Sequence, residues 1–144
     1  MTYSIKEDMQ VDLQLIDPDG DNETLTGAGV DMLGYEGVIF LAAARRGEAG
    51  DIVLKAQQDT DSAFGAAADL AGTAITMSIA VGTDAFSGIE IKNPRERYVR
   101  PALVIPNLTT ARAVCIMSIR YGAKHLPETN ADAELHSNPA EGDA

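Results

Sequence analysis

The sequence predicts an all-β protein: an antiparallel two-sheet sandwich, jelly-roll-like, with about eight strands and a flexible acidic C-terminal tail. Three observations support this prediction. Apolar and polar residues alternate with a period of two along much of the chain, which places successive side chains on opposite faces of a strand. Turn-forming sequences such as Pro18-Asp19-Gly20 separate the alternating segments. Helical periodicity is scarce.

The first half of the chain contains four predicted strands. Segment 9–15 alternates strictly, with Met9, Val11, Leu13 and Leu15 on the face predicted to be buried. Segment 24–32 is a weaker strand. Segment 38–44 is apolar on both faces, and segment 52–57 alternates again. Residues 63–70 could form either a short helix or a loop.

Four more strands are predicted in the second half. Segments 75–81 and 89–92 alternate and predict one buried face each. Segments 99–105 and 113–119 are apolar on both faces over part of their length, so each should lie centrally in a sheet or be covered by another subunit. Pro101, inside the first of these, predicts an edge strand or a bulge because proline cannot donate to the ladder.

The last predicted strand has two apolar faces. One face comprises Ala113, Cys115, Met117 and Ile119. Val114 and Ile116 form the other face, bounded by Arg112 and Arg120. An outward apolar centre with charged ends suits a subunit interface, so we predict that Val114 and Ile116 face outward. Cys115, the only cysteine, is then expected to be a buried, inert thiol.

The acidity of the chain belongs to its ends. The net charge is −11, and residues 1–23 hold seven acidic residues against one lysine. Beyond Lys124 there are five acidic residues and no lysine or arginine, which leaves the segment between the two ends neutral. We therefore divide the 144 residues into a β-sandwich domain, 1–126, whose acidic segment 1–23 could act as an arm, and an acidic flexible tail, 127–144.

These features exclude several classes of function. The acidic charge argues against direct nucleic-acid binding, which needs concentrated lysine and arginine. No apolar run is long enough to span a bilayer, and the residues after Met1 lack the layout of a signal peptide, so we expect synthesis in a cytoplasm. Without a nucleophile elbow, phosphate loop or dinucleotide fingerprint, we expect no enzyme activity and no cofactor.

Two groups of acidic residues are candidates for chemical sites. Asp17, Asp19 and Asp21 resemble the start of a calcium loop, but the glycine and the bidentate glutamate of an EF-hand are both missing, so a solvated turn is expected. A weak cation site of another kind is left open there, and we predict no other metal site. Asp51, Asp59 and Asp61 could in principle pair for acid–base chemistry, but they are expected to be solvated turn residues because nothing nearby would tune their pKa values.

The densest basic cluster contains Lys92, Arg95, Arg97 and Arg100, with Tyr98 among them. Such a cluster is either a solvated strand edge or an ion-pairing surface for an acidic partner. Tyr98 would supply an aromatic anchor in the second case.

Four segments taken together resemble small head proteins of tailed bacteriophages, of the decoration or cement type. The segments are YEGVIF at 35–40, VLKAQQDTD at 53–61 with Phe64 beyond it, NPRERYVRP at 93–101 and IRYGAK at 119–124. The resemblance spans roughly residues 30–127 and leaves both acidic ends uncovered.

The resemblance implies a homo-oligomer, most often a trimer, on the outer capsid surface of a virion. Its partner would be the major capsid protein, bound at junctions between subunits so that the head is stabilised. On this interpretation Phe40, Tyr98, Val114 and Ile116 are candidates for packing between subunits. Polar contacts with a neighbouring subunit or with the capsid would come from Arg95, Arg97 and Arg100.

Two alternatives remain at this point. One is a head–tail connector or tail component, which would form rings, usually sixfold. The other is a carbohydrate-binding β-sandwich used for host attachment, which would need an exposed aromatic platform. The absence of tryptophan argues against such a platform.

Overall fold

A computed structural model describes residues 8–17, 23–46, 50–105 and 112–124, and this part of the chain is nearly all β. It contains ten strands: β1 (Gln10–Asp17), β2 (Glu23–Thr26), β3 (Val30–Asp31), β4 (Gly37–Arg46), β5 (Gly50–Asp59), β6 (Ala68–Asp69), β7 (Ile75–Ile79), β8 (Asp84–Lys92), β9 (Tyr98–Ile105) and β10 (Arg112–Tyr121).

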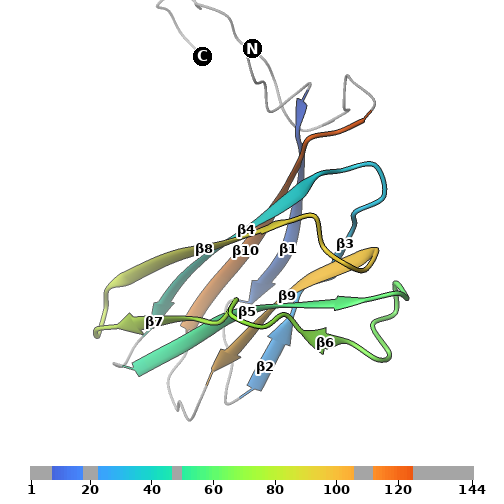
Figure 1. The fold of residues 1–144 in the computed structure, drawn as a ribbon. Coiled ribbons are helices and arrows are strands. Elements are labelled where there is room, and N and C mark those ends of the chain that lie inside the picture. The colour runs from blue at the N-terminus through green and yellow to red at the C-terminus, as the bar shows by residue number, and fades with distance from the viewer. Residues whose placement is uncertain (1–7, 18–22, 47–49, 106–111, 125–144) are drawn as a thin grey trace, which may run out of the picture.

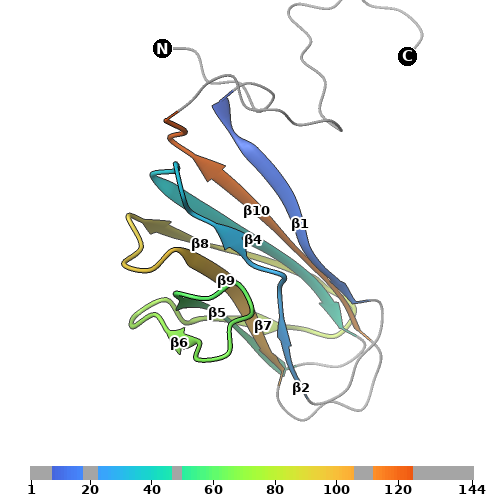
Figure 2. The ribbon, with the colours of Figure 1, turned by 90° about the vertical axis from the view of Figure 1, so that its right-hand side faces the viewer.

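The strands form two sheets that pack face to face (Figures 1 and 2). One is four-stranded, in the order β1-β10-β4-β8. The other is six-stranded, with β9 and β5 at its centre, β2 and β3 paired to β9, and β6 and β7 paired to β5. Every pairing is antiparallel. The prediction of an antiparallel two-sheet sandwich is confirmed.

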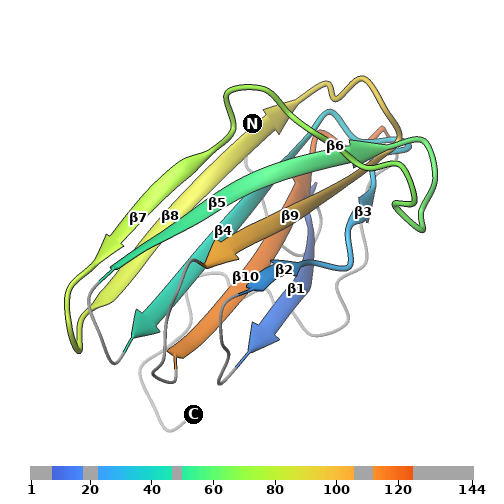
Figure 3. The same cartoon turned by 90° about the horizontal axis from the view of Figure 1, so that it is seen from below.

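The connectivity is that of a jelly roll. The first strand pairs with the last, β2 and β3 pair with β9, β4 pairs with β8, and β5 pairs with β7. Successive pairs in this nested series belong to different sheets: β1–β10 and β4–β8 form one sheet, and the pairs made by β9 and β5 form the other. Viewed from below, β7 runs beside β8, with which it forms the connection between the two sheets (Figure 3). The ten strands correspond to eight predicted segments because β2 and β3 divide one segment and β6 is an additional pair of residues.

The core lies between the sheets and consists of alternate residues from their inner faces. Ile52, Leu54 and Leu103 of the six-stranded sheet are fully buried there. They pack in one cluster with Phe40 and Ile116 of the four-stranded sheet, which are equally buried. The buried faces of β5 and β8 are those that the alternation predicts, since Ile52, Leu54, Ile89 and Ile91 all point inward.

In β1 the side chains that point toward the core are not those that the alternation predicts. A bulge between Leu13 and Leu15 shifts the register against β10, so Leu13 points to solvent while Gln14 is buried. The Gln14 amide donates to the Ser118 hydroxyl at 2.9 Å and accepts from the Gly29 N–H at 2.8 Å. Because both polar groups of this amide are paired, its burial is tolerated, and it links the two sheets.

The predicted strand 24–32 is interrupted at residues 27–29. Thr26 pairs with Ala102 and Val30 pairs with Val99, so three residues stand opposite two on β9. Pro101 lies at this irregularity, on a strand with neighbours on both sides. Its carbonyl accepts from the Gly27 N–H at 2.9 Å. Pro101 therefore marks a bulge and not a sheet edge, which resolves the two predicted possibilities.

Two other predictions concern the chain outside the main strands. Residues 63–70 form turns and the short strand β6 instead of a helix. Within the acidic segment 1–23, residues 10–17 form β1 and belong to the four-stranded sheet, which limits any arm to the residues before it. The predicted tail 127–144, Asp19 and Asp21 lie outside the described residues.

Candidate interaction surface

The side of the four-stranded sheet that faces away from the core is unusually apolar. Residues paired across an antiparallel ladder point to the same face, so the register fixes which side chains share this surface. Across β1, β10, β4 and β8 they form three successive rows: Ile16, Cys115, Ala43 and Phe86; Leu13, Met117, Leu41 and Gly88; and Val11, Ile119, Ile39 and Glu90. We call these three rows the outer apolar face.

Several large side chains on this face are open to solvent. Phe86 is 69% exposed, Ile16 63%, Leu13 57% and Met117 40%. Single exposed apolar residues are ordinary on protein surfaces, but a contiguous patch across four strands is typical of a binding surface. The signal in the sequence was the apolar character of both faces of 38–44 and 113–119. No pattern in the sequence pointed to Phe86.

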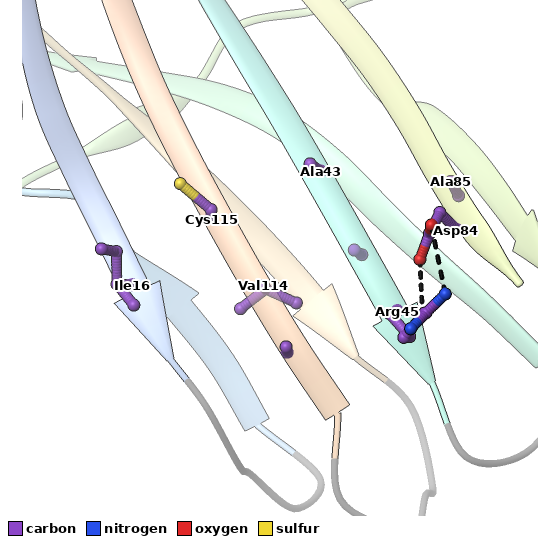
Figure 4. Close-up of a pocket in the computed structure, with 9 residues that line it drawn as sticks. Ile16, Ala43, Arg45, Asp84, Ala85, Val114 and Cys115 are labelled. Atoms are coloured by element: carbon purple, nitrogen blue, oxygen red, sulfur yellow. Dashed lines mark hydrogen bonds and ion pairs between the residues drawn. The ribbon is translucent and has the colours of Figure 1, made fainter. Parts of the chain in front are cut away.

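Polar groups border the outer apolar face at both ends. At one end Arg45 and Asp84 form an exposed ion pair at 2.6 Å, beside an open hollow lined by Ile16, Ala43 and Cys115 (Figure 4). At the other end the Tyr121 ring lies over Gly37, and its hydroxyl hydrogen-bonds the Glu90 carboxylate.

The environment of Tyr121 also changes its acidity. Burial, followed by the hydrogen bond to Glu90, raises the pKa of Tyr121 to about 12. Deprotonation would place a second negative charge beside Glu90, so the phenol stays neutral across the physiological range.

Three predicted interface residues lie elsewhere. Phe40, Val114 and Ile116 belong to the core of the sandwich, so the prediction that Val114 and Ile116 face outward is wrong. The ladder between β10 and β4 places them opposite Ala44 and Ala42 on the inner face. The opposite face of β10 is the outward one, and Cys115, expected to be buried, is half-buried on it.

Lys92, the last residue of β8, lies beside the outer apolar face, whereas the other three basic residues of the cluster lie at the β8–β9 connection and the start of β9. Arg97 donates two hydrogen bonds to Asp31, at 2.6 and 2.9 Å, and lies over the Tyr98 ring. Arg100 donates to the Gln57 side chain at 2.9 Å and stacks on Phe64. Two of the four basic side chains, Arg97 and Arg100, are therefore occupied by partners within the chain. Arg95 is exposed, and Tyr98 is half-buried.

Arg120, at the end of β10, is turned inward. It donates to the Asp12 carboxylate at 2.9 Å and to the Asp31 carbonyl at 3.0 Å, and it lies over the Tyr35 ring. These contacts connect β1, β10 and the β3–β4 turn, so Arg120 stabilises one end of the sandwich.

Asp59 is buried and organises a loop, where a solvated turn residue was expected. Its carboxylate accepts from the Asp61 N–H at 3.0 Å and from the Ala66 N–H at 2.9 Å. These two backbone hydrogen bonds lower the pKa of Asp59. The loop that they close carries Phe64, which packs beside Gly29.

This lowered pKa predicts a pH dependence of stability. Asp59 contributes stability above the ordinary aspartate pKa of about 4, and that contribution is lost as pH falls through its lower folded-state pKa. The D59N substitution should therefore lower the melting temperature most at neutral pH, and the difference from wild type should shrink below about pH 4. Thermal melts between pH 7 and pH 2 measure this. A difference that stays constant across that range would contradict it.

Two further kinds of feature are absent from the described part of the chain. No group of three or more histidine, cysteine, aspartate or glutamate side chains is placed there to hold a metal ion. Nor does this part contain a helix of the length and apolarity needed to cross a membrane.

Comparisons with known proteins show the fold alone. No protein-family model and no curated protein matches the sequence. The exported protein XepA of PBSX superposes with a TM-score of 0.52 at 17% identity, over 92% of this chain and 44% of that one, so this chain spans less than half of its length. A protein of Bacillus endospore appendages, which form disulfide-linked pili, gives a TM-score of 0.45 at 13% identity over 81% and 89% of the two chains. A CBM4 structure gives 0.47 at 10% identity over 83% and 77%.

Proposed function

We propose that this chain is a non-enzymatic structural protein of a tailed bacteriophage. It binds the outer surface of the capsid at junctions between major capsid subunits, as a homo-oligomer, and stabilises the head. The observation that carries the proposal is the outer apolar face, a surface that folding leaves uncovered across all four strands of one sheet.

The shape of this surface favours a protein partner. Ligand sites for small molecules are concave and enclose most of the ligand. The outer apolar face instead extends across β1, β10, β4 and β8, with polar groups at its two ends. An apolar centre with a polar rim is the usual arrangement of a protein–protein interface.

The phage context rests on the four resembling segments and on one solved structure. In the fold, 35–40 and 119–124 are brought together by the pairing of Gly37 with Tyr121. Segments 53–61 and 93–101 are joined by the pairing of Asp59 with Tyr98. The segments that resemble phage head proteins are therefore neighbours in pairs. The exported protein of PBSX, a phage, has a similar sandwich.

Stabilisation by such a protein follows from multivalency. A homo-oligomer presents each capsid contact in several copies, so detachment requires all of them to break together. Individually weak contacts then hold neighbouring capsid subunits together against internal pressure. No catalytic group is needed for this role.

The proposal is tested by adding the purified full-length chain to undecorated phage capsids. We expect co-sedimentation at micromolar concentration and a rise in the temperature at which the capsids release DNA. A decoy with the same net charge but an unrelated fold is the control for non-specific binding. Failure of the chain to co-sediment would overturn the proposal. A ring of six copies that binds the portal end instead would favour the connector alternative, and binding on a glycan array would favour the carbohydrate alternative.

A further inference from the structure

An open hollow lies at the end of the sandwich where β10 ends. It has a volume of about 350 Å³ and is formed by the β3–β4 turn, the β8–β9 connection and the chain just after β10. Figure 1 shows these three segments at the same end of the molecule. The lining includes Leu33, Gly34, Pro94, Arg95, Glu96 and Lys124, and we call this feature the basic hollow.

Backbone hydrogen bonds between its segments fix the shape of the basic hollow. The Met32 N–H donates to the Arg97 carbonyl at 2.8 Å, which joins the β3–β4 turn to the β8–β9 connection. The Lys124 N–H donates to the Gly34 carbonyl at 2.9 Å, which joins the chain after β10 to the same turn. A site whose walls are fixed before binding loses little conformational freedom when it is occupied.

Two cations of the basic hollow have no partner in the described part of the chain. Arg95 and Lys124 are exposed, and neither side chain forms a hydrogen bond or ion pair with a described residue. Arg97 differs, because the Asp31 carboxylate accepts two hydrogen bonds from it. With that pair set aside, the lining holds two cations against Glu96, so its net charge is positive. The basic hollow therefore suits an acidic ligand.

An apolar contact is available to the same ligand. Leu33 is 69% exposed and lies beside Pro94 in the lining of the basic hollow. A ligand that carries carboxylates next to an aliphatic side chain would match both the charge and the apolar surface of the hollow.

We propose that the basic hollow binds the acidic tail 127–144 of the same chain. The tail has five acidic residues and no lysine or arginine, and its Glu134 stands next to Leu135. It also starts at the hollow, since Lys124 belongs to the lining and the tail begins three residues later. We assign the contacts to the part of the tail that contains Asp132, Glu134 and Leu135.

Weak contacts suffice because the tail is tethered beside its site. Asp132 lies eight residues beyond Lys124, and a random chain of that length spans roughly 16 Å on average. A short tether of this kind gives an effective concentration in the millimolar range. Exposed ion pairs that are too weak to capture a separate peptide can then hold the tail in place.

The bound tail leaves the outer apolar face open. No residue belongs to both the basic hollow and the outer apolar face. One chain can therefore bind its own tail and a capsid at the same time, and the inference does not depend on the proposed function.

Paramagnetic relaxation in the full-length chain tests the proposal. C115S removes the only native thiol, and S137C then carries a nitroxide spin label two residues beyond Leu135. In a dilute, isotope-labelled sample the label should broaden the amide signals of the basic hollow. The broadening should fall at least about fivefold in about 1 M salt, where the Debye length is about 3 Å.

Charge reversal tests which residues form the contact. R95E combined with K124E should lower the paramagnetic relaxation rate at the hollow at least about fivefold, because two attractions become repulsions. Adding D132K and E134K to that variant should restore most of the broadening. In the chain without R95E and K124E, D132K with E134K should lower the rate, whereas E141K with D143K, the same charge change farther along the tail, should leave it nearly unchanged.

Three results would overturn the proposal. One is an absence of broadening at low salt, and another is broadening that neither salt nor the R95E and K124E pair reduces. The third is broadening that appears only between chains, when spin-labelled chains without isotope are mixed with isotope-labelled chains without a spin label. In that case the tail of a neighbouring copy occupies the hollow.

Discussion

Replacing Phe40 with alanine is expected to lower the free energy of unfolding by about 3–5 kcal/mol, enough to unfold a domain of ordinary stability. The Phe40 ring is fully buried between the sheets, within the cluster that contains Leu54 and Ile116. Its removal leaves a cavity that the rigid ladders on both sides of β4 prevent from closing. Urea denaturation, followed by circular dichroism, measures the loss.

Phe86 provides the control for this substitution. It lies on β8, next to β4, but its ring points away from the core and is 69% exposed. F86A should change the free energy of unfolding by less than about 0.5 kcal/mol, because exposed substitutions rarely do more. It should nevertheless weaken binding to capsids, since Phe86 is the largest side chain of the outer apolar face. A stable F40A variant, or a strongly destabilised F86A variant, would show that the two faces of this sheet have been assigned the wrong way round.

Replacing Gly29 with alanine is expected to lower the free energy of unfolding by about 3 kcal/mol, from two sources. Gly29 has a φ of +87°, a conformation that costs an L-residue about 1–2 kcal/mol. A Cβ atom at this position would also lie 2.5 Å from the Phe64 ring, which is buried and held by the loop that Asp59 closes. The ring or the Gly29 backbone must move, and the hydrogen bond from the Gly29 N–H to Gln14 would be strained.

Gly34 separates the two contributions. Its φ of +91° is nearly the same as that of Gly29, but a Cβ atom there would meet nothing within 4 Å. G34A should therefore cost only the backbone contribution of about 1–2 kcal/mol. The difference between G29A and G34A in urea denaturation then measures the packing of Phe64 against the chain. Equal losses of unfolding free energy in the two variants would mean that the Phe64 ring moves aside without a measurable cost in free energy.

The strands could be predicted from the sequence wherever one face is apolar and the other polar. In β5 and β8 the alternation is local and strict, so Ile52, Leu54, Ile89 and Ile91 point inward as predicted. The antiparallel sandwich followed from the same pattern and from the turn residues between strands. Its jelly-roll order is consistent with that pattern, although the pattern alone does not identify which strands pair.

The phase of β1 could not be predicted. Met9, Val11, Leu13 and Leu15 alternate without interruption, and nothing in the residues themselves shows the bulge after Leu13. The bulge becomes favourable only because Ser118 and the Gly29 N–H, both distant in sequence, satisfy the Gln14 amide. Burying the Gln14 amide without these partners would cost free energy. Uninterrupted alternation was therefore the simpler prediction for β1 from the sequence.

The outer apolar face, too, could be predicted only in part from the sequence. The sequence by itself determined that segments 38–44 and 113–119 carry apolar residues on both faces, and hence that one surface of this protein needs a cover. Only the tertiary structure decided which surface that is. Both faces of β10 are apolar, so burial of either would be favourable, and the choice depends on the ladder with β4 that sets Val114 and Ile116 opposite the small residues Ala44 and Ala42. That register joins residues about seventy positions apart, and it leaves Met117, Leu41 and Leu13 together on the outside.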